Sequence, residues 1–338
     1  MNLQKAFARN VAFPALNFLG VPKLLSQRSS NRRMILYYHG VTKNAFSRYS
    51  GRPFLTATFE KHLRYLKGNF SIVPLAEIFD MYRNDIIPAR QTIAITFDDG
   101  FLNNYENVFP LLKKYGVPAT IFVSACSVED PDAILFFDLI HSIYQVSMEG
   151  LNISGHHFEK HAVYDFFDNA GNLPIQDYIK LLGAFERDAL LSHLKKQFRT
   201  EMAAGRIDPL MWRLMNADQM KELSDSGLVE IGSHGYSHFN LANIEESIME
   251  DEITRSKKLI ESAILKPVIT FSFPDGSYNE AVKSACLRAG YRNLCAVRYK
   301  DAGDEDDRSV LHRHGPSATT TYSSNIFFIH NAFKHSGF

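Results

Sequence analysis

An acidic pair and a histidine pair, far apart in the chain, are the side chains that a hydrolytic metal centre needs. Asp98 and Asp99 end an apolar run, and His234 and His238 stand four residues apart. One carboxylate and two imidazoles can bind a zinc-like ion and leave a position open for water. The second carboxylate then remains available as a general base. These residue types in this pattern predict metal-assisted hydrolysis.

Each pair taken alone has a simpler explanation. An Asp-Asp-Gly sequence after a strand is a common turn, and two histidines can lie on a surface loop. If residues 234–238 turn helically, both imidazoles share one face, which suits a single ion. Two histidines and a carboxylate also bind the iron of non-haem oxygenases, but a second adjacent aspartate favours hydrolysis.

His157 and His161 have the same spacing and serve as an internal comparison. They fall in a predicted hairpin around Gly155, with no acidic strand end nearby in the sequence. We therefore expect them to be solvated surface residues rather than a second metal site.

Two further segments follow predicted strands and could take part in the chemistry. His39 could protonate a leaving amine, and the alternative is a core or rim histidine. His312 and His314 are further candidates for that acid. In the turn at residues 274–278, Asp275 could supply a backbone N–H to a tetrahedral oxyanion. The acidic stretch 301–307 is predicted to be a solvated loop.

The elements around these residues alternate between strand and helix. That alternation predicts an α/β fold with parallel strands, in which the active site gathers at the carboxyl ends of the strands. Strands are predicted at 34–38, 70–73, 92–97, 119–123, 229–231, 268–273 and 293–297, and helices at 58–67, 75–83, 104–115, 218–226, 245–264 and 279–289.

Residues 127–215 break this alternation and are interpreted as a helix-rich insertion into the domain. A helix is predicted at 134–144, a hairpin at 151–164 and helices within 176–199. The main domain then comprises residues 34–126 and 216–314, and residues 315–338 form a helical tail.

The N-terminal segment, residues 1–33, is basic and apolar, and no acidic residue precedes Glu60. Such a segment could lie on an anionic membrane surface, with a packing arm and a cleaved signal as alternatives. The formal net charge of zero gives no general case for nucleic-acid binding. Three cysteines without a Cys-x-x-Cys pair fit a reducing compartment. We expect a cytoplasmic protein at the periphery of the inner membrane, with export as the alternative.

The motifs resemble those of NodB-like polysaccharide deacetylases, which form carbohydrate esterase family four. They are Thr-Phe-Asp-Asp-Gly at 96–100, Ser-His-Gly-Tyr-Ser-His at 233–238 and Phe-Pro-Asp-Gly at 273–276. The resemblance implies an irregular (β/α)7 barrel, with Asp99, His234 and His238 as metal ligands and Asp98 as the base. Leu-Tyr-Tyr-His at 36–39 is similar to the family's acid motif moved to the front, as in the exopolysaccharide deacetylase branch, which makes His39 the expected acid.

The same resemblance implies the cofactor and the substrate. It indicates a divalent ion, with Zn²⁺ ahead of Co²⁺ or Mn²⁺, and an N-acetylated amino sugar in a glycan or in a lipid-linked or nucleotide-linked precursor. A catalytically silent carbohydrate-binding or scaffold homologue is the alternative.

The chain departs from the family pattern in two places. No arginine precedes the third motif, where residues 269–271 are Ile-Thr-Phe, and no tryptophan follows Trp212. We expect Arg313, on a late strand, to replace the missing arginine as the partner of Asp98.

Overall fold

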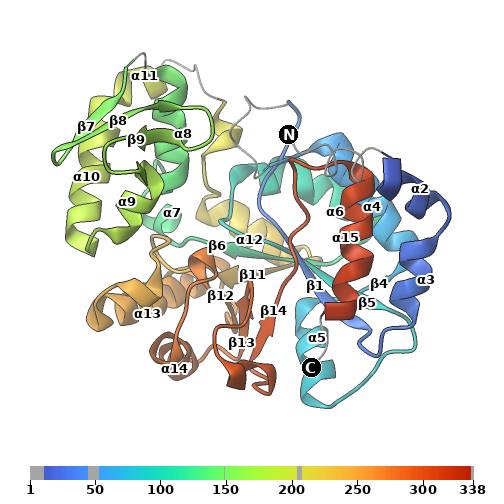
Figure 1. Ribbon diagram of the computed structural model, residues 1–338. Helices are drawn as coiled ribbons and strands as arrows, with labels where there is room; N and C mark the ends of the chain where they lie inside the picture. The colour runs from blue at the N-terminus through green and yellow to red at the C-terminus, as the bar shows by residue number, and fades with distance from the viewer. Residues whose placement is uncertain (1–10, 45–52, 148, 204–207, 336–338) are drawn as a thin grey trace.

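The computed structural model describes residues 11–44, 53–147, 149–203 and 208–335, and its centre is a parallel sheet curled into a barrel (Figure 1). Among the described residues, seven parallel strands follow one another around this sheet. In spatial order they are β1 (Arg33–Tyr38), β5 (Thr92–Phe97), β6 (Ala119–Val123), β11 (Val229–Ser233), β12 (Thr270–Ser272), β13 (Asn293–Ala296) and β14 (Val310–His312).

The barrel closes where the chain passes beyond β14. His314 forms a parallel bridge with Leu36 of β1, through the hydrogen bonds Tyr37 N–H to His314 O and His314 N–H to Ile35 O. An eighth short strand, β4 (Ser71–Ile72), pairs with the start of β5, whereas β6 pairs with its end. The predicted α/β fold and the irregular (β/α)7 barrel are confirmed.

Helices cover the outside of this barrel, and several end at the residues that helix physics favours. Asn216 caps α12 (Ala217–Asp225) reciprocally with Gln219, and Gly116 ends α6 (Phe109–Tyr115) in a left-handed conformation. The others are α4 (Thr56–Asn69), α5 (Leu75–Arg83), the π-helical turn η2 (Asn104–Val108), α13 (Glu246–Ile264) and α14 (Glu280–Arg288), with short turns η3 (Pro209–Met211), η4 (Leu241–Asn243), η5 (Pro274–Gly276) and η6 (Ala302–Glu305). A small sheet pairs β2 (Val41–Thr42) with β3 (Phe54–Leu55).

The core has two parts because side chains alternate along each strand. Leu36 and Ile95 belong to the large cluster between strands and helices. Their neighbours Ile35 and Ala94 belong instead to a smaller cluster with residues of three other strands and of α5. We interpret the smaller cluster as the barrel interior, which α5 closes at one end.

Residues 126–203 form a unit with a core of its own, seen in green at the upper left of Figure 1. The predicted hairpin is present, and two further strands that were not predicted extend it to a four-stranded antiparallel sheet. Its elements are α7 (Cys126–Glu129), α8 (Phe136–Val146), β7 (Leu151–Ile153), β8 (His156–His161), β9 (Asp165–Asp168), β10 (Leu173–Pro174), α9 (Ile175–Leu181), α10 (Ala184–Gln197) and α11 (Arg199–Ala203).

The two ends of the chain pack together on the side of the barrel. Helices α2 (Phe13–Phe18) and α3 (Val21–Gln27) lie along α15 (Tyr322–His335), as the blue and red ribbons of Figure 1 show. Ser26 Oγ lies 2.7 Å from His330 Nδ1, and the rings of Phe13 and Phe327 stack 4.5 Å apart. In the described part of the chain, no helix combines the length and the apolar character that crossing a bilayer requires. Residues 1–10 of the predicted N-terminal segment lie outside the described residues.

Candidate metal centre

Asp99, His234 and His238 come together at the carboxyl end of the barrel. Asp99 follows β5, and His234 is the first residue after β11. Their ligand atoms all lie within 4.8 Å of one another, and all three residues are buried. Asp99 Oδ1 is 3.7 Å from His234 Nε2 and 3.4 Å from His238 Nε2. Residues 139 positions apart in the chain thus form one candidate ligand set, as the motifs predicted.

A divalent cation fits this arrangement. Two ligand atoms that are each about 2.1 Å from a tetrahedral ion lie about 3.4 Å apart, close to the two separations found here. His234 Nδ1–H donates to the Ser272 carbonyl oxygen at 2.7 Å, which leaves Nε2 as the lone-pair nitrogen that faces Asp99. Burial lowers the pKa of His234 to about 4, so this imidazole is neutral at pH 7, as a metal ligand must be.

The backbone around these ligands is held in conformations that side chains rarely adopt. Asp99 and His238 have φ values of 74° and 59°, in the left-handed region. The expectation of a helical turn at residues 234–238 is wrong, because this segment is a loop and the left-handed His238 turns its ring toward His234. Gly100 also has a positive φ, and a Cβ there would meet Val123 at 2.9 Å. Such strain is characteristic of functional sites.

Asp98 lies beside this ligand set and is held by Arg313. The guanidinium donates from Nη1 to Asp98 Oδ1 at 2.7 Å and from Nη2 to Oδ2 at 2.8 Å. Arg313 also donates to Thr96 and Ser272, and its side chain is fully buried. Burial alone would raise the pKa of Asp98, but Arg313 and then His234 outweigh burial, so the pKa lies below its ordinary value. Asp98 is therefore an ionised and oriented carboxylate at neutral pH.

His39 opens on the same cavity as the ligand set, a space of about 320 Å³. The other two candidates for the acid, His312 and His314, line a different and much smaller cavity, where their Nε2 atoms lie 3.0 Å apart. Of the three histidines considered for protonating the leaving group, only His39 lines the cavity that contains Asp98.

Asp275 stands at the edge of this cavity in a left-handed conformation, with φ of 56°. The residue as a whole is exposed, but its side chain is only 18% exposed, so much of the open surface is main chain. Lys180 of α9 lies 3.5 Å from the Asp275 carboxylate. This arrangement leaves the main chain of Asp275 accessible to a group in the cavity.

His157 and His161, the internal comparison pair, do not share the geometry of His234 and His238. His157 is exposed and contacts Asn152, and His161 stacks on Tyr164. Both lie on β8, where positions four apart on an extended strand are separated by about 13 Å. They do not form a metal site with each other.

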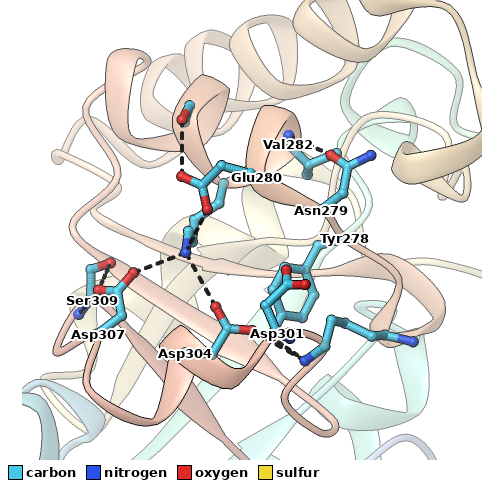
Figure 2. A network of polar contacts seen from close by, with 11 residues as sticks. Tyr278, Asn279, Glu280, Val282, Asp301, Asp304, Asp307 and Ser309 are labelled. Carbon is cyan, nitrogen blue, oxygen red and sulfur yellow. Dashed lines mark hydrogen bonds and ion pairs between the residues drawn. The ribbon is translucent and has the colours of Figure 1, made fainter.

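The acidic stretch 301–307 is not simply the solvated loop that its composition predicted. Asp304 is fully buried and accepts a hydrogen bond from Tyr278 Oη at 2.6 Å. The Lys283 ammonium group pairs with Asp304, Asp307 and Glu280, three carboxylates that Figure 2 labels. The network ties the turn after β12, which carries Asp275, to the loop before β14.

Comparison with known proteins decides the family. The sequence profile of the polysaccharide deacetylase family matches residues 86–294, which is more than half of the chain and includes the Asp98–Asp99 and His234–His238 motifs. This chain belongs to the polysaccharide deacetylase family.

Relatives and solved structures agree with this assignment. YxkH of Bacillus subtilis, named as a polysaccharide deacetylase, is 24% identical over 82% of this chain and 69% of its own length. A poly-beta-1,6-N-acetyl-D-glucosamine N-deacetylase of Staphylococcus aureus is 28% identical, over 30% of this chain and 39% of its own. The deacetylase PplD of Streptococcus pyogenes has the same fold, with a TM-score of 0.56 at 16% identity over 87% of this chain and 95% of its own. IcaB of Ammonifex degensii also has a TM-score of 0.56, at 17% identity over 90% of this chain and 98% of its own.

Two side chains that sequence reasoning missed hold the histidine loop of this deacetylase. Arg187, from α10, donates to the carbonyl oxygens of Ser237 and His238 at 3.1 and 3.3 Å. It is 4% exposed, and its guanidinium lies over the rings of Phe136 and Phe239. Burial lowers the pKa of Arg187 to about 10, which still leaves it charged at pH 7.

Glu252, from α13, holds the same loop from the other side. Its carboxylate accepts from the backbone N–H groups of Tyr236 and Ser237, at 3.0 and 2.9 Å, and from the Ser237 hydroxyl. Nothing local in the sequence marks Arg187 or Glu252, because both are ordinary helix residues whose partners come from another segment.

The insertion also contributes to the wall of the site. Phe137 of α8 and Gln176 of α9 line the same cavity as the ligand set. The Phe137 ring meets the His238 ring edge to face, with centroids 5.3 Å apart. An apolar ring and an amide therefore face the space that a substrate would enter.

Proposed function

We propose that this chain is a metal-dependent hydrolase that removes an N-acetyl group from an amino sugar of a surface polysaccharide or its precursor. The observation that carries the proposal is that Asp98, Asp99, His234, His238 and His39 all line one cavity. The cavity combines a ligand set for a divalent cation with a carboxylate and an imidazole that are not needed as ligands.

Zn²⁺ is the cation that we propose, with Co²⁺ or Mn²⁺ as alternatives, since imidazole and carboxylate donors bind all three. Asp99, His234 and His238 would hold it. When bound, such a cation polarises a carbonyl group and lowers the pKa of water.

The side chains around that position have separate tasks. Asp98 would accept a proton from the attacking water, because Arg313 keeps the carboxylate ionised and oriented. The main-chain N–H of Asp275 would stabilise the negative oxygen that forms on the acetyl carbon. His39 would donate a proton to the amine nitrogen as the C–N bond breaks, giving acetate and a free amino sugar.

For the substrate, we propose a glycan that contains N-acetylated amino sugars, with lipid-linked and nucleotide-linked precursors as alternatives. The names of the Staphylococcus aureus relatives, which are poly-beta-1,6-N-acetyl-D-glucosamine N-deacetylases, support a polymer. The cavity supports a sugar, because it offers both an aromatic ring and polar groups.

We propose that the protein works at the cytoplasmic face of the inner membrane, with export as the alternative. The three cysteines are free, as is common in reducing compartments. Fractionation of cells that express the full chain, followed by detection in the membrane, cytoplasmic and external fractions, tests this location.

Acetate release by the purified protein tests the activity. The panel contains N-acetylhexosamine polymers and free, nucleotide-linked and prenyl-phosphate-linked sugars, with added Zn²⁺, Co²⁺ or Mn²⁺ or with a chelator. Asp98→Asn is the matched control, and we expect it to lose on the order of a hundredfold or more in turnover while still binding the metal. Stoichiometric metal binding without acetate release from any substrate would favour a catalytically silent carbohydrate-binding protein instead.

A further inference from the structure

A second cavity, about 380 Å³ in volume, lies away from the candidate metal centre. Three basic residues line it, namely Lys23 on α3, Arg32 just before β1 and Arg90 just before β5. The other lining residues are Gln27, Gly68, Asn69, Ala89 and Gln91, so no acidic residue lines the cavity.

The three basic side chains donate hydrogen bonds to neutral oxygens. Lys23 Nζ donates to Asn69 Oδ1 at 2.9 Å, Arg32 Nη1 to the Ala89 carbonyl at 2.6 Å, and Arg90 Nη2 to the Gly68 carbonyl at 3.1 Å. Within the described parts of the chain, none of the three forms an ion pair with a carboxylate. Positive charges that converge from three segments without a counter-charge attract an anion, and guanidinium groups match phosphate oxygens in particular.

Large apolar side chains are exposed on the same chain segments as Lys23 and Arg90. Leu24 follows Lys23 on α3, and Ile86 and Ile87 precede Ala89, which lines the cavity; each is at least half exposed. Phe18, at the end of α2, is 91% exposed, and Leu19 is 71% exposed. Single exposed apolar residues are common, but several of them on segments that also carry cations without a carboxylate partner are typical of a membrane surface.

Helices α2 and α3 are an integral part of the fold rather than a loose arm. Asn17 Nδ2 donates to the Ser323 carbonyl and Ser29 Oγ to the Phe333 carbonyl, both at 2.6 Å. Ser26, between them in the chain, is fully buried against His330. The exposed residues of α2 and α3 are therefore presented from a fixed backbone, along α15 (Figure 1).

We propose that the basic cavity and the adjoining apolar residues form a binding surface for an anionic lipid bilayer. A lipid phosphate would occupy the cavity among Lys23, Arg32 and Arg90, and the apolar side chains would enter the headgroup region. Charge complementarity selects this occupant, because the cavity has three uncompensated cations and apolar residues beside it.

The position of this surface has a consequence for the active site. Gln91 lines the basic cavity directly before β5, and Asp98 lines the catalytic cavity directly after it. The two cavities thus lie at opposite ends of a six-residue strand, about 20 Å apart. A bilayer bound at the start of β5 leaves the catalytic cavity open to the aqueous side, where a glycan chain can reach it.

Co-sedimentation of the full chain with lipid vesicles tests the proposal. We expect binding to vesicles that contain phosphatidylglycerol, weaker binding as salt rises, and none to phosphatidylcholine alone. The triple variant Lys23→Gln, Arg32→Gln, Arg90→Gln should bind about a hundredfold more weakly, since each cation near an anionic surface contributes about fivefold. A second variant, Phe18→Ser with Leu24→Ser, should also weaken binding while leaving the charge unchanged.

A control triple, Lys196→Gln, Arg199→Gln, Lys258→Gln, removes the same charge from exposed positions elsewhere and should keep wild-type binding. Thermal melting of each variant shows that it is folded. Equal loss in the control triple would overturn the proposal, because general electrostatics would then explain the binding. The proposal would also be overturned if the wild type bound neither kind of vesicle but bound inorganic phosphate, because the cavity would then be a site for a free anion.

Discussion

At the scale of single residues, the bidentate pair between Arg313 and Asp98 is the contact on which the proposed base depends. Arg313 follows β14 directly, and it approaches Asp98 from a position 215 residues away in the chain. Two parallel N–H···O bonds fix the plane of the carboxylate as well as its charge. The proposed role of Asp98 therefore depends on this paired geometry.

Arg313→Gln should lower turnover strongly and leave metal stoichiometry unchanged. The buried Asp98 would lose its main positive partner, its pKa would rise, and the acid limb of the kcat/KM profile would move to higher pH. Breaking a buried pair also destabilises the fold by about 3–5 kcal/mol, so assays belong well below the melting temperature.

Arg308→Gln is the matched control, because Arg308 lies just before β14, on the other side of that strand from Arg313, and pairs with the exposed Asp85. Mass spectrometry measures the metal content of each variant, and the pH dependence of kcat/KM measures the shift of the acid limb. Loss of metal together with unchanged residual turnover would refute the assigned role of Arg313.

His39→Ala should lower kcat by about 10²- to 10⁴-fold, the range of general acid–base catalysis, with little change in bound metal. His314→Ala, which alters a histidine that lines a different cavity, should leave kcat near the wild-type value. Steady-state acetate release compares the two variants. If His314→Ala were the more damaging change, the acid would have to be reassigned.

At the scale of elements, the loop that carries His238 is held from two helices that belong to different parts of the chain. Arg187 of α10 binds its carbonyl groups, and Glu252 of α13 binds its N–H groups. Because His238 has a left-handed backbone, the loop needs such outside support to keep its imidazole near Asp99. The insertion is thus structurally coupled to the ligand set and also lines the cavity.

Arg187→Met should weaken metal binding by about 10- to 100-fold, the usual effect of removing a group that orients a metal ligand. The measurement is metal affinity by competition with a chromogenic chelator. Lys196→Met, an exposed position on the same helix, is the control and should bind metal as the wild type does. Unchanged affinity in Arg187→Met would limit this residue to a packing role.

At the scale of the whole molecule, a buried carboxylate links the segments that precede and follow β13. Asp304 joins the turn after β12 to the loop before β14 through Tyr278 and Lys283. Burial would raise the pKa of Asp304, but the hydrogen bonds from Tyr278 and from backbone N–H groups outweigh it, so the pKa is lowered. A carboxyl group whose pKa is lowered by folding stabilises the fold above its unfolded pKa and loses that contribution as pH falls.

Asp304→Asn should therefore reduce the free energy of unfolding at pH 7 by about 2 kcal/mol, the value of hydrogen bonds to a charged group. The difference from wild type should shrink as the pH falls below about 4, the ordinary aspartate range, and through the lowered pKa. Urea unfolding at several pH values measures this difference in the free energy of unfolding. Asp306→Asn, at an exposed neighbouring position, should have little effect, and a pH-independent loss in Asp304→Asn would contradict the charge-based explanation.

Features of this protein that depend on local pattern could be predicted from the amino-acid sequence. β5, β6 and α5 coincide with the predicted ranges, because apolar runs and helical spacing are properties of neighbouring residues. The motifs with Asp98, Asp99, His234 and His238 were visible for the same reason, and parallel strands bring their ends to one pole.

Features that depend on contacts between distant segments became visible in the folded structure alone. No local sequence pattern marks the contact of Arg187 with the His238 loop or the burial of Asp304 within an acidic stretch. The same is true of the position of His312 and His314 outside the catalytic cavity. The free energy of a charge depends on its burial and partners, and these are set by the packing of segments that the chain order does not bring together.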